Sequence, residues 1–541
     1  MVNIGFYGSH NACMVIEKDK DITLVLEIER ILNFKNSGVA QYKTVRPDYI
    51  HPIVEYLRDY ILKAAGVEQF DNCYHMNTDV LIGTKRYELE KIIPAKNYKY
   101  GLHHESHAAG AFYQSPFEEA LAFSFDGGGN DGFFNIYHAT RKDSVKLLEC
   151  VLNPLDNTPH IYYDLGFPYM VMGNYLKDIR LEPLSEGNLV FPGKVMGLVS
   201  YGKIKKDWIE PLIEFYKSRP DGLTYVEKIK TLSEKIGVTL DTSTRLEGQI
   251  AYDLAASSQH AFEECFIEIV KPYIDKYKKL PIIMSGGCAL NIILNTRIKK
   301  EFKRDVFVGP NPNDCGLAAG MLLHQSKPLK QVDLTYSGPA LLDFNNFGNY
   351  IQNYDGRLAV EMVNNTRIAK QLAAGKIIGV ARERSEHGPR ALGNRSILCN
   401  PAIKEMKDIL NSKVKNREWY RPFAPACTVE DADKYFTHTT ESPYMLLIAQ
   451  VKEEFKEKLP SITHVDGTAR LQTVRRETNQ RYYDVIKEFG KLSGIPVILN
   501  TSFNEAGEPI VETPADAIRC FLKNDIDYLV VENYLITPIR D

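Results

Sequence analysis

Predicted strands and helices alternate along this chain, and several of the strands end in a glycine turn. Val2–Tyr7, Met14–Glu17 and Thr23–Leu26 are short runs rich in branched side chains, which is typical of strands. Alternating strands and helices indicate the α/β class, which places ligands beside turns at strand ends. Further strands are predicted at Ala120–Phe125, Phe133–His138, Ile282–Met284, Val306–Val308, Ile377–Ala381, Val497–Leu499 and, as the final strand, Tyr528–Val531. Helices are predicted at Tyr49–Ala65, Ser106–Tyr113, Ala251–Tyr277, Gly316–His324, Arg367–Ala374 and Ala515–Leu522.

The length of the chain predicts two or three domains. It has 541 residues, and a domain takes roughly 150. Residues from about Ser326 to Arg357 show no clear periodicity and carry Gly, Pro and Asn, so we expect a linker there. The expected division is a first domain at 1–340 and a second at 355–541.

Composition limits the class of protein. The formal net charge of -3 gives no overall basic bias, so we expect no nucleic-acid partner. The nine cysteines are odd in number and form no C-x-x-C pair, which favours reduced thiols in a cytoplasm. The first residues lack the pattern of a signal peptide, and no apolar run reaches the roughly 18 residues of a membrane helix. We therefore expect a soluble, cytoplasmic protein with no membrane contact.

His103 and His107 stand four residues apart in the run LHHESHAAGAF. On a helix this spacing puts both imidazoles on one face, where they could share a metal ion, while His104 points elsewhere. Two histidines at this spacing are more often ordinary surface or core residues. The pattern is also not the H-E-x-x-H of a zinc protease. A metal site therefore needs support from other segments.

Two aspartates supply that support. Asp126 ends a predicted strand in FSFDGGGNDG, where the amides of Gly127 and Gly128 could approach a nucleotide phosphate; a plain hairpin turn is the alternative. Asp314 precedes a helix of small residues, whose N-terminus could face an anion; helix capping is the alternative. Two His and two Asp form a ligand set compatible with iron, manganese or zinc.

A third glycine turn lies in the run MSGGCALN. Gly286 and Gly287 stand between a predicted strand and a helix. This arrangement can wrap a nucleotide phosphate or ribose, but two glycines also make an ordinary turn.

The second half of the chain is rich in arginine at glycine and proline turns. Arginine binds phosphate and carboxylate oxygens through two parallel hydrogen bonds. The apolar neighbours Pro389, Phe423 and Pro425 indicate a pocket for a polyanion, whereas a solvated surface is the alternative for any single arginine. The group contains Arg382, Arg384, Arg390, Arg395, Lys415, Arg417, Arg421, Arg470, Arg475 and Arg476, with Asn500, Thr501 and Ser502 at a predicted strand end.

Ten segments together resemble the NodU/CmcH/TobZ carbamoyltransferase family over essentially the full length of the chain. No single segment is specific, but all ten follow the order found in the family. They are SHNA, HHESHAAGAF, FDGGG, GKVMGLVSYG, SGGCALN, NPNDCGLAAG, HGPRALGNRSI, KNREWYRPFAP, HVDGTARLQTV and NTSFNEAGEPIVETP.

The resemblance implies a fold and a two-step reaction. It implies an N-terminal domain of the actin/hexokinase-like (ASKHA) ATPase class and a C-terminal YrdC-like α/β domain. The C-terminal domain of such proteins makes carbamoyl adenylate from carbamoyl phosphate and ATP, for which we expect Mg²⁺. The N-terminal domain then transfers the carbamoyl group to a hydroxyl of a small molecule such as a sugar, aminoglycoside or other natural product. A metal ion, usually taken as iron(II), holds the phosphate of the intermediate.

The resemblance also assigns residues to these steps. His10 could take the hydroxyl proton as a general base or only orient the acceptor. The implied metal ligands are His103, His107, Asp126 and Asp314, and the implied nucleotide turn is Gly286, Gly287 and Asn291. Lys35 is implied beside the carbamoyl carbonyl, and Arg390, Lys415, Arg421, Arg470, Asn500 and Ser502 are implied in the pocket for carbamoyl phosphate and ATP.

Three departures and two alternatives accompany the resemblance. Asn11 and Cys13 stand where an acidic residue and a serine are expected, Asn130 where an acidic residue is common, and His387 where an aromatic is common. The first two concern the acceptor, whose identity stays open together with the metal and the oligomeric state, a homodimer included. The alternatives are a tRNA threonylcarbamoyladenosine-type transferase, disfavoured by the neutral charge and the fused domains, and a non-enzymatic ATP- or metal-binding regulator.

The acceptor pocket is expected in two variable segments, 143–186 and 42–54. Aromatic side chains there, at Tyr162, Tyr163, Phe167 and Tyr169, could stack on a sugar face, although core packing is their commoner use.

Overall fold

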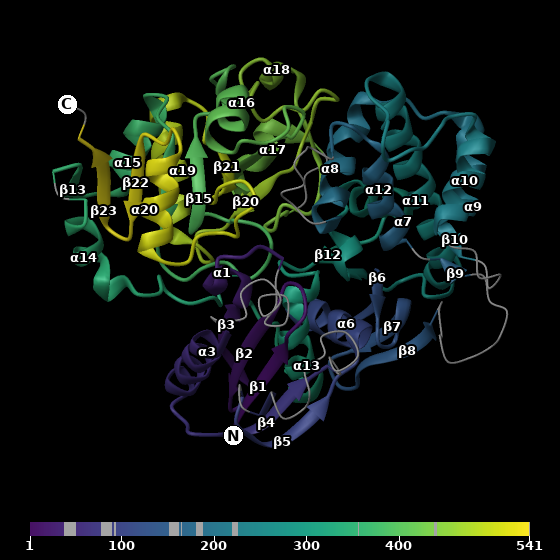
Figure 1. Ribbon diagram of the computed structural model, residues 1–541, viewed down its shortest axis with the longest axis horizontal. Helices are drawn as coiled ribbons and strands as arrows, with labels where there is room; N and C mark the ends of the chain where they lie inside the picture. The colour runs from purple at the N-terminus through teal and green to yellow at the C-terminus, as the bar shows by residue number, and fades with distance from the viewer. Residues whose placement is uncertain are drawn as a thin grey trace. The chain divides into compact units, whose positions relative to one another are not determined.

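The computed structural model divides the chain into two compact units (Figure 1). The first unit contains Met1–Ile28 and Asn36–Leu334, and the second contains Glu29–Lys35 and Thr335–Asp541. A short N-terminal segment therefore belongs to the second unit, which no sequence pattern indicated. The residues described are 1–36, 50–76, 89–90, 93–150, 162–163, 165–179, 188–218, 225–354, 356–437 and 441–539.

The first sheet of the first unit has the strand order β3-β2-β1-β4-β5. Strands β1, β2 and β3 pair antiparallel through short turns, whereas β4 and β5 are parallel to β1. Parallel neighbours need a long crossover, and α3 lies in the crossover that precedes β4. The bounds are β1 Val2–Tyr7, β2 Cys13–Lys18, β3 Asp21–Glu27, α1 Ile28–Leu32, α3 Ile50–Ala65, β4 Phe70–His75 and β5 Ala95–Tyr100.

The second sheet repeats this plan. Its order is β12-β11-β6-β7-β8, with β6, β7 and β8 antiparallel and with β11 and β12 parallel to β6. Two sheets with three antiparallel strands followed by two parallel ones form the duplicated core expected of the actin/hexokinase-like class. The bounds are β6 Glu119–Gly129, β7 Gly132–Thr140, β8 Ser144–Cys150, β11 Ile282–Ser285 and β12 Val306–Val308.

Two helices fill the space between the sheets of the first unit. These are α6 (His103–Gln114) and α13 (Leu317–Ser326), and their apolar residues share one core cluster with residues of both sheets. The helices cross closely at Gly110 and Gly320. A Cβ atom on Gly320 would lie 2.0 Å from the carbonyl oxygen of Ser106, so only glycine permits this approach.

The remaining helices of the first unit form a second layer around α11, which packs against α8 and α9. The bounds are β9 Tyr162–Tyr163, α7 Gly166–Met172, α8 Phe191–Leu198, α9 Lys206–Tyr216, β10 Lys217–Ser218, α10 Tyr225–Ile236, α11 Gln249–Lys276 and α12 Ile292–Phe302.

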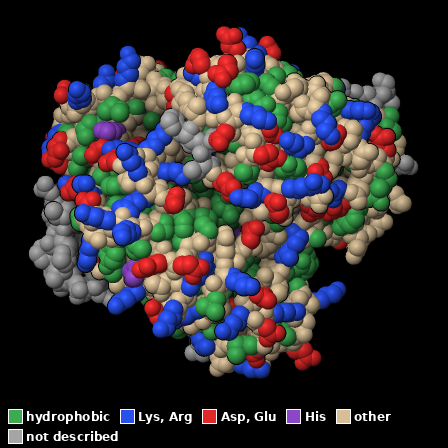
Figure 2. Space-filling model, turned by 180° about the vertical axis from the view of Figure 1, so that it is seen from behind, with side chains coloured by type: hydrophobic (Ala, Val, Ile, Leu, Met, Phe, Trp, Pro, Cys, Tyr) green, Lys and Arg blue, Asp and Glu red, His purple; other side chains and the backbone are tan. Residues whose placement is uncertain are grey.

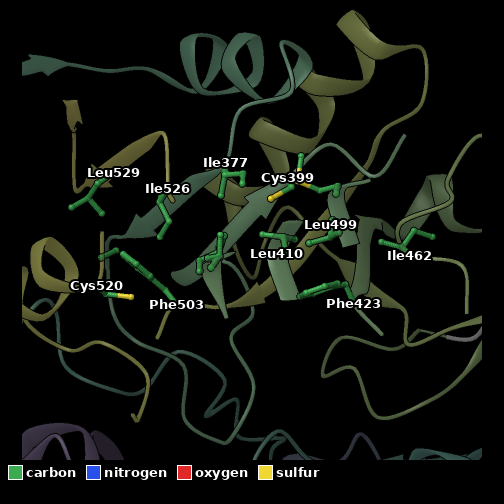
Figure 3. Packing of buried hydrophobic residues seen from close by; sticks show 14 of the residues in the cluster. Ile377, Cys399, Leu410, Phe423, Ile462, Leu499, Phe503, Cys520, Ile526 and Leu529 are labelled. Atoms are coloured by element: carbon green, nitrogen blue, oxygen red, sulfur yellow. The ribbon is translucent and has the colours of Figure 1, made fainter. Parts of the chain in front are cut away.

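The second unit is built on a mixed sheet of order β13-β23-β22-β14-β15-β21-β16-β20. Alternate side chains along strand β14 point to opposite faces of this sheet. Ile378 and Val380 pack against α15 and α19, whereas Ala381, and Ile377 just before the strand, join the cluster drawn in Figure 3 with Phe503 and its neighbours. The strands are β13 Leu358–Met362, β14 Ile378–Ala381, β15 Arg395–Cys399, β16 Ala424–Thr428, β17 Phe436–Thr437, β18 Ala449–Val451, β19 Thr468–Ala469, β20 Gln472–Val474, β21 Val497–Ser502, β22 Tyr528–Val531 and β23 Tyr534–Pro538. The helices are α14 Phe347–Gln352, α15 Asn365–Ala373, α16 Met406–Ile409, α17 Ala432–Tyr435, α18 Glu453–Lys456, α19 Gln480–Ser493 and α20 Pro514–Lys523.

The structure confirms the α/β class and corrects two sequence predictions. The segment at about 326–357 is not simply a linker, because Ser326 ends α13 and the residues from Thr335 onward belong to the second unit. Leu341 and Phe347 of this segment are buried in the core of that unit. Strand β22 is also not the last strand, since β23 pairs with it through a turn.

Surface charge and hydropathy agree with the composition. Lysine and arginine side chains are interspersed with aspartate and glutamate over the face seen in Figure 2, as a net charge of -3 predicts. Among the described helices, none is long and apolar enough to cross a membrane.

Candidate metal centre and arginine cluster

Four predicted ligands converge in the first unit. One ligand atom each from His103, His107, Asp126 and Asp314 lie within 4.8 Å of one another. The two histidines come from the start of α6, Asp126 from the β6–β7 hairpin, and Asp314 from the turn before α13. His104 does not join them. Its ring lies between the Ser124 hydroxyl and the Gly132 carbonyl, 2.9 Å from each.

The distances between these atoms fit a metal ion. The Nε2 atoms of His103 and His107 are 3.1 Å apart, and the Nε2 of His107 is 3.4 Å from a carboxylate oxygen of both Asp126 and Asp314. His103 lies slightly farther from the same oxygens, at 3.8 and 3.7 Å. Four ligands about 2.1 Å from a metal in tetrahedral geometry stand about 3.4 Å apart. The two nitrogens and two oxygens suit iron, manganese or zinc.

Backbone amides orient the carboxylate of Asp126. Gly127 N donates to Oδ1 at 2.7 Å, and Gly287 N donates to Oδ2 at 2.6 Å. Oδ2 is also the oxygen that approaches the histidines. Gly286 has a φ of +89°, and a Cβ atom there would lie 2.1 Å from the carbonyl oxygen of Phe125. The close pairing of β6 and β11 ends therefore requires glycine.

The charged groups of this centre hold each other ionised. Burial alone would raise the pKa of Asp126, but His103 and His107 keep that pKa well below its ordinary value. Burial would lower the pKa of His107, but its hydrogen bonds to Asp126 and Asp314 raise that pKa to about 9. A metal ion that binds here would displace the proton of His107 and take its place between the two carboxylates.

His10 lies at the edge of the centre. Its Nε2 is 3.4 Å from Asp314 Oδ2, and about a third of the side chain is exposed. Its Nδ1 contacts the side-chain oxygen of Asn11 at 3.3 Å. The role beside the acceptor that the resemblance implies for His10 stays a prediction.

The nucleotide assignments in the first unit stay predictions. The amides of Gly127 and Gly287 are engaged by Asp126, and Gly128 has a φ of +142°. Asn291 caps α12 by accepting from Leu294 N at 3.0 Å, and its amide group donates to Gln259 at 2.9 Å. In the structure Gly127 and Gly287 orient Asp126, and Asn291 caps the start of α12.

Of the four aromatic side chains predicted for an acceptor pocket, the structure describes two. The side chains of Tyr162 and Tyr163, like most of 143–186 and of 42–54, lie outside the described residues. Tyr169 is buried and donates to Gln259 at 2.6 Å, so it is a core residue, whereas Phe167 is exposed.

In the second unit, four arginines lie close enough for their charges to act on one another. Burial and the neighbouring Arg421 lower the pKa of Arg390 to about 10. Burial together with Arg421 lowers the pKa of Arg417, and burial together with Arg390 lowers that of Arg470, both well below the ordinary value. Of these four arginines, only Arg421 forms an ion pair among the described residues, with Glu418 at 3.5 Å. The group carries more positive than negative charge and fits an anion.

Lys415, Asn500 and Ser502 are held by neighbouring groups. The ammonium of Lys415 donates to the carbonyls of Ser502 and Asn504 at 2.9 and 2.7 Å, and to the Asn504 side chain at 2.5 Å. Asn500 is buried and donates to Gln472 at 2.8 Å, while Ser502 donates to Asn504 at 2.6 Å. Lys415 therefore positions the loop after β21.

Lys35 belongs to the second unit, although the resemblance placed it beside the carbamoyl group in the first domain. Its charge contributes, after burial and Arg417, to a pKa of Lys415 well below the ordinary value. Its predicted role stays a prediction.

The other arginines of the predicted group have other surroundings. Arg395 is fully buried and bonds Glu512 at 3.2 Å, and Arg384 donates to the carbonyls of Ser337 and Gly338. Arg382 is buried, and Arg475 and Arg476 pair with Glu441 and Asp484 on the surface.

Sequence reasoning missed several residues of both sites. Tyr7, which donates to Asp314 at 2.6 Å, and Asp131, which accepts from His104 N at 2.8 Å, carried no signal. Asn130, which accepts from His103 N at 2.9 Å, was noted only as a departure from a pattern. Arg417 was included in the arginine-rich group but not in the predicted pocket. Apolar flanks around Arg417, such as Phe423, whose ring lies 4.4 Å from its guanidinium, are the signal that could have found it.

The fold and the two sites define a class: a two-unit α/β protein with a candidate metal centre in a duplicated core and a cationic cluster in a second unit. Family models for the N-terminus and the C-terminus of carbamoyltransferases match residues 12–323 and 369–538. The chain belongs to the carbamoyltransferase family, and it is a transferase enzyme.

Relatives that align with most of the chain support this. The chain is 33% identical to the nodulation protein NolNO of Sinorhizobium fredii, over 97% of this chain and 79% of that protein. It is 35% identical to NolO of Bradyrhizobium diazoefficiens, over 80% and 78%, and 29% identical to nodulation protein U of Rhizobium tropici, over 99% and 96%. Among solved structures, full-length HypF in a phosphate- and nucleotide-bound form has a TM-score of 0.34 at 12% identity, covering 60% of this chain and 46% of that one.

Proposed function

We propose that the protein is an ATP-dependent O-carbamoyltransferase that acts through carbamoyl adenylate. The second domain, 355–541 and YrdC-like, forms the adenylate from carbamoyl phosphate and magnesium-bound ATP. The first domain, 1–340, transfers the carbamoyl group to a hydroxyl of a small molecule in the cytoplasm. The acceptor class is a sugar, an aminoglycoside or another natural product.

The first step consists of two reactions, both in the second unit. Water cleaves carbamoyl phosphate to carbamate and phosphate. A carbamate oxygen then bonds to the α-phosphorus of ATP, and the bond to the leaving pyrophosphate breaks. Arg390, Arg417, Arg421 and Arg470 would bind the phosphates and stabilise the charge that develops on them. Lys415 holds the Ser502 loop in place beside them.

The second step takes place in the first unit. An acceptor hydroxyl attacks the carbamoyl carbon, the bond between that carbon and the AMP oxygen breaks, and AMP leaves. His10 takes the hydroxyl proton. His103, His107, Asp126 and Asp314 would hold a divalent metal such as iron(II), which would supply Lewis-acid stabilisation of the phosphate. AMP is a far better leaving group than hydroxide, which is why prior adenylation helps.

One observation carries this proposal: among the described residues Arg390, Arg417 and Arg470 form no salt bridge, although each lies close enough to another arginine of the group for the neighbouring charge to lower its pKa. Keeping unpaired cations half-buried costs stability, so such a cluster supports a bound polyanion. The four-ligand centre in the other unit supports a second chemical step there.

The test measures pyrophosphate release with ATP, Mg²⁺ and carbamoyl phosphate. We expect release that depends on carbamoyl phosphate and that Arg421→Ala lowers about 100-fold or more. His107→Ala is expected to leave pyrophosphate release unchanged and to abolish transfer of labelled carbamoyl groups to a panel of sugar hydroxyls.

The matched control is Arg475→Ala, which removes a surface arginine of the same unit paired with Glu441. It should release pyrophosphate at the wild-type rate. Folded protein that releases none in the presence of carbamoyl phosphate would exclude the adenylate mechanism.

A further inference from the structure

The helix that carries both histidines has no cap of its own at its N-terminus. Leu102 occupies the capping position of α6 and offers no side-chain hydrogen bond. The first amides of a helix have no partner within the helix, so they must find one elsewhere when they are buried. His103 and His104 are both buried.

The turn between β6 and β7 supplies the missing partners. His103 N donates to Asn130 Oδ1 at 2.9 Å. His104 N donates to Asp131 Oδ1 at 2.8 Å, and Glu105 N donates to Asp131 Oδ2 at 3.2 Å. Two side chains from one hairpin therefore satisfy three consecutive amides of the first turn. A carboxylate is also favoured there by the positive end of the helix dipole.

The same hairpin touches the metal centre itself. Its strand β6 carries the ligand Asp126. Its Gly129 packs against the imidazole of His103, because a Cβ atom on that glycine would lie 2.7 Å from both Cβ and Cγ of the histidine. The ligand Asp126, the ring-contacting Gly129 and the capping residues Asn130 and Asp131 therefore lie within six consecutive residues.

The C-terminal end of α6 is held by Arg141, which directly follows β7. Arg141 donates to the carbonyls of Ser115 at 2.6 Å and Tyr113 at 3.2 Å. Residues flanking a single strand thus fix both ends of the helix. The first turn of α6 carries His103, a predicted ligand, whereas the last turn carries none. The cap from Asn130 and Asp131 therefore acts on a ligand, and the cap from Arg141 does not.

We propose that Asp131, assisted by Asn130, is a positioning residue for the metal centre. By completing the first turn of α6, the two side chains keep His103 Nε2 beside His107 Nε2 and the Asp126 oxygen. Without them the first turn loses its hydrogen bonds and frays, and His103 leaves the centre. This inference rests on the metal role within the proposed function.

The test titrates the full-length protein, stripped with chelator, with cobalt(II) and follows the visible absorption of the bound ion. Removing a supporting partner of a ligand typically costs 10- to 100-fold in affinity. We expect Asp131→Ala to weaken cobalt(II) binding about 10-fold or more and to change the absorption spectrum. Asp131→Asn keeps one acceptor oxygen and should fall between that variant and wild type.

Arg141→Ala is the matched control, because it removes the cap at the other end of the same helix. It should lower the melting temperature while leaving cobalt(II) affinity and spectrum as in wild type. Equal affinity in Asp131→Ala and wild type, or equal loss in Arg141→Ala and Asp131→Ala, would overturn the inference.

One further variant and the wild-type titration itself allow the result to be interpreted. If Asp131→Ala does not fold, Asn130→Ala decides by the same criteria, because it removes an exposed side chain from the turn. Wild-type protein that binds no cobalt(II) would refute the metal role itself, whereas normal wild-type binding with unaffected variants refutes only the positioning role. Pyrophosphate release in the second unit should be unchanged in every variant.

Discussion

Tyr7 donates a 2.6 Å hydrogen bond to Oδ2 of Asp314. Tyr7 ends β1 and Asp314 stands before α13, so the bond joins the first sheet to the helix that packs on it. His103 and His107 approach the other oxygen, Oδ1. The tyrosine therefore fixes which oxygen of the carboxylate faces the histidines.

Tyr7→Phe should weaken metal binding while preserving the fold. The ring stays, but Oδ2 loses its donor and the carboxylate can rotate. Loss of such a partner is expected to lower metal affinity about 10-fold. Calorimetric titration with zinc(II) measures the affinity. Tyr98→Phe is the control, because Tyr98 lies in β5 and donates to the carbonyl of Ile93. Equal affinities in wild type and Tyr7→Phe would contradict the prediction.

Gly320→Ala should damage both stability and metal binding. The added Cβ would lie 2.0 Å from Ser106 O, so α6 and α13 must move apart and take the histidines away from Asp314. We expect a loss on the order of 2–3 kcal/mol in the free energy of unfolding, measured by urea denaturation. Gly348→Ala in α14, where a Cβ meets nothing within 4 Å, should be neutral or slightly stabilising. Similar losses at both positions would argue against the crossing as the cause.

Arg390→Met should stabilise the protein that has no substrate bound. Burial and Arg421 lower the pKa of Arg390 to about 10, so its charge is held at a cost. Removing that charge is expected to add about 1 kcal/mol to the free energy of unfolding and to abolish pyrophosphate release. Thermal unfolding and the release assay check the two effects.

Arg395→Met serves as the contrast for this prediction. Arg395 is fully buried and bonds Glu512 and the carbonyls of Arg382 and Glu383, so its loss leaves buried partners unsatisfied. It should destabilise by about 3 kcal/mol or more. A destabilised Arg390→Met would show that the cluster is structural.

Asp431→Asn should destabilise the second unit in a pH-dependent way. Burial would raise the pKa of Asp431, but hydrogen bonds from Lys434, Lys487 and Thr428 lower it to about 2. The unfolded value is about 3.9, so the stabilisation is complete above pH ~4 and lost as the pH falls towards 2. The variant should lose on the order of 2 kcal/mol at pH 7.

Urea denaturation at pH 7, 5 and 3.5 measures this difference. The gap between wild type and Asp431→Asn should be the same at the two higher pH values and smaller at the lowest. The control Asp484→Asn, which removes one partner of a surface pair with Arg476, should change stability little at any pH. A gap that does not narrow in acid would mean that the charge of Asp431 is not the cause.

Much of the secondary structure could be predicted because it depends on neighbours in the sequence. The predicted strand Val306–Val308 coincides with β12, and the predicted helix Ala251–Tyr277 lies within two residues of α11 at both ends. The linker prediction failed at Leu341 and Phe347, since an irregular segment without periodicity can still bury apolar side chains in a core. The final strand β23 was missed because its pairing partner, β22, is what makes it a strand.

The candidate site was predictable only in part. The spacing of His103 and His107 determined a shared face, because a helix repeats every 3.6 residues. Arg390 and Arg395, by contrast, look alike in one short sequence motif, yet Arg390 lies beside Arg421 in the arginine cluster and Arg395 forms a buried ion pair with Glu512. No local pattern distinguishes them.

By itself, then, the sequence determined the α/β alternation, the ligand types and their spacing on α6, all of which depend on residues a few positions apart. Only the tertiary structure brought Asp126 and Asp314 to the same histidines, gave Tyr7 its carboxylate partner and set Asn130 and Asp131 on the start of α6. Those contacts depend on the strand order of two sheets and on the close crossing of two helices. They join residues distant in the chain, so no short-range pattern encodes them.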